Sequence, residues 1–172
     1  RDEIVYYSIS KDKTDKFRVS EDKIDFLYGL SANKRYAVFT VGKGYYVVDV
    51  AKKSIITEGT IDNFIESFDI SNDASIFCYT KSDGTGWIVN IDSGKIRSIL
   101  NNQTISCFRV APDGKTAAAI CNDGFIRIVN LENDNVVDKI EYHGRTSDYV
   151  EFSQDGKLLY LQGANRYLQI YD

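Results

Sequence analysis

The ionisable side chains of this sequence offer few combinations that could carry out catalysis. His143 is the only histidine among the 172 residues, so no pair of histidines can bind a metal or relay a proton. A Ser/His/Asp triad with Asp148 is conceivable, yet no serine stands in the strained turn that exposes a nucleophile. We therefore predict no catalytic residue and expect His143 to form structural contacts within its own repeat.

The three cysteines do not form a metal-binding pattern. Cys78, Cys107 and Cys121 all fall in apolar, strand-like runs, without Cys-x-x-Cys spacing or a histidine nearby. The acidic turns at 72–73 and 82–84 also lack the alternating ligands of a calcium-binding loop. We predict no metal and no cofactor, and expect buried thiols that act as small hydrophobic groups. Their odd number favours a reducing, cytoplasmic compartment.

The composition indicates a folded, strand-rich protein that does not bind nucleic acid. Hydrophobic residues make up 43% of the sequence and aromatic residues 13%, with a single proline. The net charge is −4 and both signs are spread along the chain, whereas a nucleic-acid interface needs clustered Lys and Arg. No apolar run is long enough to insert into a membrane. The chain starts at Arg1 and contains no methionine, so we expect it to be part of a longer protein.

An internal repeat with a period near forty residues organises the whole chain. A residue that opens a turn between two apolar strands recurs at intervals of 40, 40 and 42 residues, at Ser31, Ser71, Ala111 and Ser153. The last residue of a second series of strands recurs at intervals of 41, 40 and 42 residues, at Asp49, Asn90, Asn130 and Asp172. Because two independent landmarks keep one period, the sequence predicts a repeat protein.

Each repeat unit reads as four short antiparallel strands. The apolar stretch before the turn is the first strand, and a buried second strand follows it. Third strands are expected at 45–50, 87–91 and 126–131, and weaker fourth strands at 54–57, 96–100 and 136–140. Four such strands with a turn every eight to twelve residues make one β-propeller blade. The predicted fold class is all-β, with four-stranded blades arranged radially, about four blades' worth in this chain, and almost no helix.

We expect a single, partial propeller domain over residues 1–172. The expected repeats are 1–22 (partial), 24–60, 64–101, 104–141 and 147–172 (partial). The first of them contributes strands at 4–9 and 16–20, and the last ends after its third strand.

Two pairs of motifs resemble those of WD repeats. The runs SDGTGWIVN (82–90) and NDGFIRIVN (122–130) are similar to the family's third strand, in which an Asp-Gly turn precedes a strand ending in Trp-Asp. The runs APDGK (111–115) and SQDGK (153–157) resemble its first hairpin turn. Lactonase-type and surface-layer-type propellers have a similar first turn. His143 stands ten residues before Ser153, where the family places the histidine of Gly-His.

The sequence also departs from the WD pattern. The Trp of Trp-Asp is replaced by Val48, Val89, Val129 and Tyr171, and only one repeat has the histidine. The family's hydrogen-bond network of His, Asp, Ser/Thr and Trp therefore cannot form fully, and we expect apolar packing between blades to stabilise the propeller. Asp83 and Asp123 keep the family's Asp position, which implies a structural role for both.

The resemblance implies a non-catalytic scaffold that binds a protein or peptide, as part of a larger multidomain protein. In WD propellers, partners usually contact the loops before the first strand and between the second and third strands. Carried over to this sequence, the expected binding residues are Lys43, Tyr45, Asn63, Arg145, Arg166 and Tyr167. If Arg145 and Arg166 join one patch, an acidic peptide is the expected partner.

Two other functions remain open. A propeller enzyme of the lactonase or sugar-hydrolase type would gather polar side chains around the central channel. The only ionisable residues of the expected first strands at these positions are Asp69, Arg109 and Glu151, which alternation places on one face. Alternatively, the blades are a structural dimerisation unit.

An open arc of blades would leave two apolar sheet faces in water. If each exposes several hundred Å², the lost burial is on the order of 10 kcal/mol per face at ~25 cal/mol per Å². We expect the ring to be completed by the remainder of a propeller of about seven blades, by a second copy in a homodimer of eight blades, or by closure of four blades alone.

Overall fold

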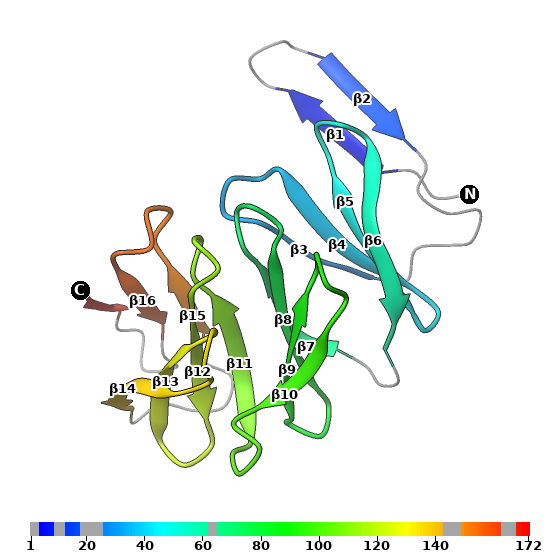
Figure 1. Ribbon diagram of the computed structural model, residues 1–172. Helices are drawn as coiled ribbons and strands as arrows, with labels where there is room; N and C mark the ends of the chain where they lie inside the picture. Colours follow the sequence, from blue (N-terminus) through cyan, green and yellow to red (C-terminus); the bar gives the residue numbers. More distant parts are fainter. Residues whose placement is uncertain (1–3, 9–12, 18–25, 62–64, 143–148, 163–167) are drawn as a thin grey trace.

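The repeat units fold as separate antiparallel sheets, each a meander of strands in chain order. The computed structural model describes residues 4–8, 13–17, 26–61, 65–142, 149–162 and 168–172 (Figure 1). Blade 1 contains β3 (Phe26–Leu30), β4 (Tyr36–Val41), β5 (Gly44–Asp49) and β6 (Ser54–Thr60). Blade 2 contains β7 (Ile65–Ile70), β8 (Ile76–Lys81), β9 (Gly86–Asn90) and β10 (Ile96–Ile99). Blade 3 contains β11 (Ile105–Val110), β12 (Thr116–Cys121), β13 (Phe125–Asn130) and β14 (Val136–Glu141).

Two smaller sheets accompany these three blades. Blade 4 contains β15 (Tyr149–Phe152), β16 (Leu159–Gln162) and β17 (Leu168–Tyr171). Near the N-terminus, β1 (Ile4–Ser8) pairs with β2 (Lys13–Phe17). The second strand was expected at 16–20; it includes residues 16–17 but begins three residues earlier, at Lys13, and residues 18–20 lie outside the described part of the chain. Charged residues are depleted in strands, so an apolar pattern places the start of this strand too late.

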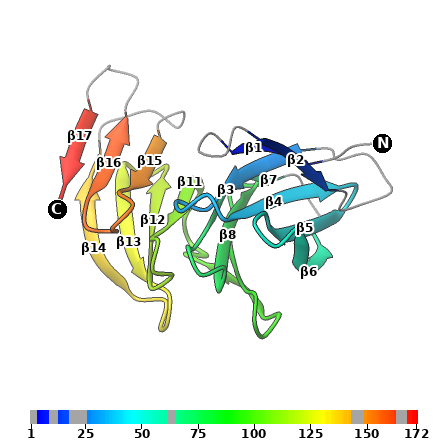
Figure 2. The ribbon, with the colours of Figure 1, turned by 90° about the horizontal axis from the view of Figure 1, so that it is seen from above.

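The sheets stand side by side around a common inner edge (Figures 1 and 2). The first strands of the blades, β3, β7, β11 and β15, contact one another in that order. The strands β6, β10 and β14 are the opposite edges of their sheets. This radial arrangement confirms the predicted all-β propeller architecture. The described residues form no helix that is long and apolar enough to span a membrane.

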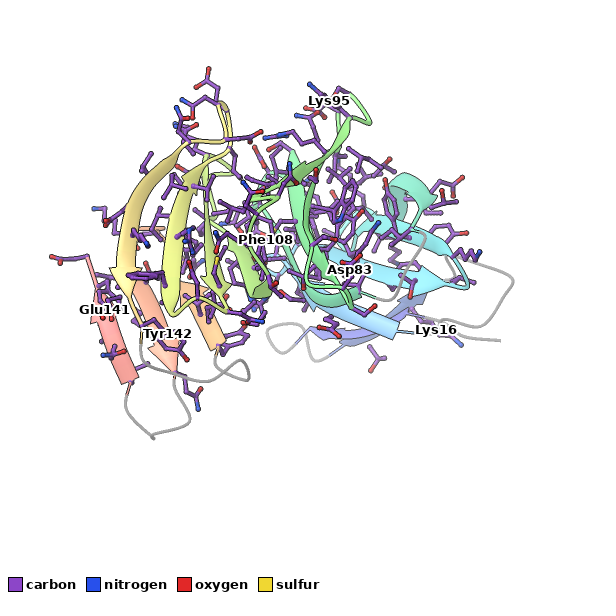
Figure 3. The ribbon with its side chains drawn as sticks, turned by 90° about the horizontal axis from the view of Figure 1, so that it is seen from below. Lys16, Asp83, Lys95, Phe108, Glu141 and Tyr142 are labelled. Atoms are coloured by element: carbon purple, nitrogen blue, oxygen red, sulfur yellow. The ribbon has the colours of Figure 1, made fainter. Side chains whose placement is uncertain are left out.

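Apolar side chains fill the spaces between successive blades. Val47 of blade 1 and Phe77 of blade 2 belong to one buried cluster, and Phe108 of blade 3 is fully buried in the next one, against blade 2 (Figure 3). Ile120 of blade 3 packs with Leu161 of blade 4 in a third cluster. Both faces of blades 2 and 3 are therefore covered, and burial of this apolar surface is the main stabilising contribution to the array.

The cysteines lie inside these apolar clusters. Cys78, Cys107 and Cys121 are buried free thiols, which confirms the prediction from their apolar surroundings. Burial raises the pKa of the Cys78 and Cys121 thiols, so both stay protonated at neutral pH.

The turn between the first and second strands has the same hydrogen bonds in three blades. In blade 2, Ser71 Oγ donates to Asp73 Oδ1 at 2.6 Å and accepts the N–H of Ile76 at 3.1 Å. Equivalent bonds are made in the first and last blades by Ser31 and Ser153. In blade 3, Ala111 has no hydroxyl group, and the Asp113 carboxylate alone accepts a backbone N–H across the turn. These turns lie at the end of each blade where the first strand finishes.

Candidate functional site

The loops at the other end of the strands meet on one face, which we call the loop face. In its described part, this face contains the turns 42–43, 82–85 and 122–124 and the loop residues 61, 100–104 and 142. Backbone bonds from Ile61 N to Lys43 O and from Tyr142 N to Gly124 O, at 2.8 and 2.7 Å, come from the residue directly after strand four. In blade 2, the bond from Ile105 N to Gly84 O, at 2.8 Å, comes from the first residue of β11. In each blade, the turn between strands two and three is thus tied to the chain segment that follows strand four.

The blade 2 turn shows how closely these loops pack. Gly84 has a φ of +79°, and a Cβ added to it would lie 2.3 Å from Thr104 Cγ2. A side chain at this position would therefore meet both backbone strain and a steric clash. Glycine is required for the turn to approach the loop.

The structure describes two of the six expected binding residues. Lys43 is exposed on the loop face, where its carbonyl accepts the bond from Ile61. The expectation for Tyr45 as a surface anchor is wrong: it is 4% exposed and packs edge-on against Phe77 with ring centroids 5.0 Å apart. Strand β5 alternates, and the Tyr45 side faces blade 2 rather than solvent. The remaining four lie outside the described residues, as does His143: Asn63, Arg145, Arg166 and Tyr167.

Asp83 and Asp123 each form hydrogen bonds close to their own turns. Asp83 Oδ1 accepts the N–H of Thr85 at 2.9 Å and its hydroxyl at 2.6 Å, and these bonds lower the pKa of the Asp83 carboxyl. Asp123 pairs with both terminal nitrogens of Arg127, at 2.8 and 2.5 Å, and this pairing lowers the pKa of Asp123. Both carboxylates thus hold a turn of the loop face in a fixed shape.

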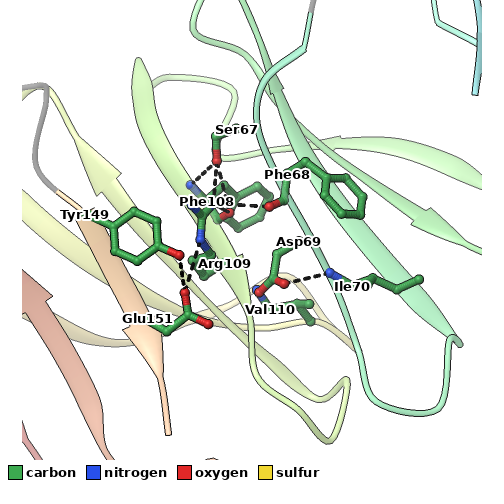
Figure 4. A network of polar contacts seen from close by, with 9 residues as sticks. All are labelled: Ser67, Phe68, Asp69, Ile70, Phe108, Arg109, Val110, Tyr149 and Glu151. Carbon is green, nitrogen blue, oxygen red and sulfur yellow. Dashed lines mark hydrogen bonds and ion pairs between the residues drawn. The ribbon is translucent and has the colours of Figure 1, made fainter. Parts of the chain in front are cut away.

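A polar network connects the innermost strands of blades 2 and 3 (Figure 4). Ser67 on β7 bonds to β11 in both directions: its Oγ donates to Phe108 O at 3.1 Å and accepts the N–H of Phe108 at 2.9 Å. Asp69 Oδ2 accepts the N–H of Val110 at 3.0 Å, and its Oδ1 accepts the N–H of Ile70. Side chains of β7 therefore satisfy backbone groups of β11 that have no strand partner on that side.

Arg109 extends the network to blade 4. Its Nη1 donates to Ser67 Oγ at 2.9 Å and to Phe68 O at 3.3 Å, while its Nε lies 3.8 Å from Glu151 Oε2. The guanidinium also lies over the ring of Tyr149, 4.5 Å from the centroid, and the Tyr149 hydroxyl donates to Glu151 Oε2. We call Asp69, Arg109, Tyr149 and Glu151 the inner-strand cluster.

The electrostatics of the inner-strand cluster are set mainly by burial. Burial raises the pKa of Asp69 to about 7, although Arg109 and two backbone N–H groups favour its ionised form. Arg109 is 12% exposed, whereas Glu151 is 41% exposed. Within the described residues, no group of three or more His, Cys, Asp or Glu side chains is placed to hold a metal ion.

The sequence identified part of this cluster. Asp69, Arg109 and Glu151 each stand two residues before the turn-opening residue of their repeat, and the structure brings them together as alternation predicts. Ser67 and Tyr149, two residues earlier in their strands, were missed. The signal for them was their equivalent repeat position, which alternation places on the same side of the strand as the charged residues.

With this geometry established, comparisons with known proteins define the class. No protein-family model matches the sequence. The chain superposes on the β-propeller domain of Cps50 (Swd1) from Myceliophteria thermophila with a TM-score of 0.74 and 12% identity, over 98% of this chain and 57% of that one. The protein is therefore a β-propeller array.

A match in sequence narrows the class to one type of propeller. The chain is 24% identical to Protein groucho of Drosophila melanogaster over 115 residues. This stretch covers 64% of the chain and 16% of Groucho. Together with the Asp-Gly turns at Asp83 and Asp123, these findings support blades of the WD-repeat type. The chain spans less than two thirds of the length of either relative.

Proposed function

We propose that this chain is a non-catalytic protein-interaction platform whose partner docks on the loop face. The observation that carries the proposal is the set of three backbone bonds that tie the turn between strands two and three of each of blades 1 to 3 to the chain that follows strand four. A surface held in shape before binding loses little conformational entropy when a partner docks. The similarity to WD-type propellers, which commonly serve as interaction scaffolds, supports the same function.

The proposed partner is a protein segment with acidic side chains. Arg145 and Arg166 belong to loops that the repeat pattern assigns to this face, as does Lys43. Guanidinium groups pair with carboxylates through two parallel hydrogen bonds, and arginine is common among residues that dominate binding energy. Tyr167, which follows Arg166 in the sequence, and Asn63, which precedes β7, complete the proposed contact set.

An affinity capture with a matched control tests this proposal. The immobilised chain is compared with Arg145→Glu/Arg166→Glu, and with Lys115→Glu/Lys157→Glu, which makes the same charge change on exposed turns at the opposite ends of the strands. Captured proteins are quantified by mass spectrometry, and those enriched by the unmodified chain are re-expressed for direct titration.

The expected result is a partner that binds the unmodified chain and the Lys115/Lys157 variant but is lost at least tenfold from the Arg145/Arg166 variant. Circular dichroism on all three proteins checks that the sheets are retained. Equal recovery by all three would place the partner elsewhere on the protein and contradict docking on the loop face.

A further inference from the structure

The inner-strand cluster lies away from the loop face. Asp69 and Arg109 are the fifth residues of six-residue strands, and Glu151 is the third residue of a four-residue strand. First strands run from the loop face towards the turns opened by Ser71 and Ala111, so these side chains lie nearer to the opposite ends of the strands. Tyr149 is the first residue of β15 and lies nearer to the loop face than the three charged residues do.

The charges of the cluster do not balance. Two carboxyl groups, of Asp69 and Glu151, flank the single guanidinium of Arg109 (Figure 4). The other ionisable groups that interact with these three are the Cys78 and Cys107 thiols and the Tyr149 phenol, and burial raises the pKa of Cys78 and of Tyr149. Above the pKa of Asp69, where both carboxyls are ionised, the cluster therefore carries one uncompensated negative charge.

Part of this negative charge is accessible. Glu151 Oε2 is engaged by Tyr149 and Arg109, whereas its Oε1 has no hydrogen-bond partner among the described residues. Tyr149 is 44% exposed, and Arg109 occupies one face of its ring. A carboxylate oxygen without a described partner, on a side chain that is 41% exposed, beside a half-exposed aromatic ring is the combination that recognises a positively charged group.

We infer that the inner-strand cluster binds one cationic side chain, a lysine or arginine carried by a partner segment, with its charge paired to Glu151 Oε1 and its alkyl stem against Tyr149. Arg109 is the positioning residue: it holds Tyr149 and Glu151 in place through its contacts with both. Its own Nη1 is fixed by Ser67 and by two backbone carbonyls of β7 and β11.

The incomplete compensation of Asp69 supports this inference. Burial raises the pKa of this carboxyl to about 7 even with Arg109 nearby, and a cation bound close to it would favour its ionised form. A cation bound at Glu151 would act on both carboxyls at once.

The test is an NMR titration of the 15N-labelled chain with three probes that differ only in side-chain charge. The probes are N-acetyl-arginine amide, N-acetyl-lysine amide and neutral N-acetyl-glutamine amide. We expect saturable shifts of the backbone amides of residues 149–151 and of Arg109 with the two cationic probes, and none with the neutral probe. Whether the arginine or the lysine probe binds more tightly then identifies the side chain preferred.

Two variants separate a binding site from a structural cluster. Glu151→Gln keeps the size of the side chain and removes its charge, and should weaken binding of the cationic probes by roughly fivefold. Glu132→Gln, at an exposed turn of blade 3, makes the same change elsewhere and should bind as the unmodified chain does. Tyr149→Phe, which keeps the ring and frees Glu151 Oε2, should retain binding.

The inference is overturned if the neutral probe causes the same shifts as the cationic probes, or if folded Glu151→Gln binds them with unchanged affinity. The amide spectrum of each variant reports directly whether it is folded. If Glu151→Gln does not fold, loss of binding in Tyr149→Leu, with binding retained in Tyr149→Phe, supports the site; equal binding by these two variants contradicts it.

Discussion

Replacing Asp69 with asparagine should change how the stability of the protein depends on pH. In an unfolded chain, an Asp carboxyl has a pKa near 4. In the folded protein, burial raises the pKa of Asp69 to about 7. Between these two values, the folded state holds a proton that the unfolded state releases, so the folded state is stabilised by low pH and loses that stabilisation as pH rises through about 7.

The size of this effect follows from the difference in pKa. One pKa unit corresponds to about 1.4 kcal/mol, so Asp69 lowers the free energy of unfolding by on the order of 4 kcal/mol from pH 4 to pH 8. Asparagine does not titrate and contributes no such slope. Its amide NH2 replaces one of two acceptors for backbone N–H groups, which costs about 1–3 kcal/mol at every pH. Asp69→Asn should therefore be clearly destabilising at pH 5 and much less so, or stabilising, at pH 8.

Urea unfolding followed by Trp87 fluorescence measures this difference. Trp87 is the only tryptophan, and it stacks on Tyr79 with ring centroids 6.5 Å apart, so its emission reports on the packing of blade 2. Asp83→Asn is the control: bonds from Thr85 lower the pKa of Asp83 below its ordinary value near 4, so its difference from the unmodified protein should stay constant from pH 5 to pH 8. A difference between Asp69→Asn and the unmodified protein that stays constant from pH 5 to pH 8 would refute the reasoning.

Three further experiments test the packing, the blade contacts and the turns. Phe108→Ala empties a fully buried site between blades 2 and 3 and should cost about 3–5 kcal/mol in urea unfolding. A double-mutant cycle of Arg97→Ala and Asp134→Ala, whose side chains pair at 2.9 Å between blades 2 and 3, should give a coupling of about 0.5–1 kcal/mol that falls with added salt; zero coupling would show that the pair is incidental. Gly84→Ala should be more destabilising than Gly94→Ala by roughly 1 kcal/mol or more: both have positive φ, but only Gly84 has a neighbour in the way. Equal melting temperatures for the two alanine variants would argue against the tight loop packing.

The strands and their order could be predicted from the sequence because the same pattern of apolar residues and turns occurs in each repeat. The third strand expected at 87–91 is observed at Gly86–Asn90, and the turn at Ser71 has the expected place between β7 and β8. Asp-Gly pairs mark turns reliably because glycine supplies positive φ, as at Gly84 and Gly124. The start of β2 was misplaced because charged residues give little strand signal.

Contacts between blades were harder to predict. Tyr45 was misassigned because both faces of a propeller blade are buried, so alternation cannot tell which side chains face a neighbouring blade and which face solvent. The bonds from Ser67 to Phe108 join residues 41 positions apart, and no local pattern encodes such a distance. The repeat period and the alternation along each strand thus predict which residues occupy equivalent positions in neighbouring blades. They do not predict which of these residues are in contact.

The contacts between inner strands run from each blade to its immediate neighbours, as β3 to β7, β7 to β11 and β11 to β15. The changes in the free energy of unfolding that two substitutions cause should therefore be additive when the substitutions lie in interfaces that share no blade. An array of this kind tolerates gradual sequence divergence, since the loss of a motif in one blade can be offset by changes in the packing between that blade and its neighbour. That freedom accounts for repeats that keep their length while the residues at equivalent positions, such as Asp69, Arg109 and Glu151, have become chemically different.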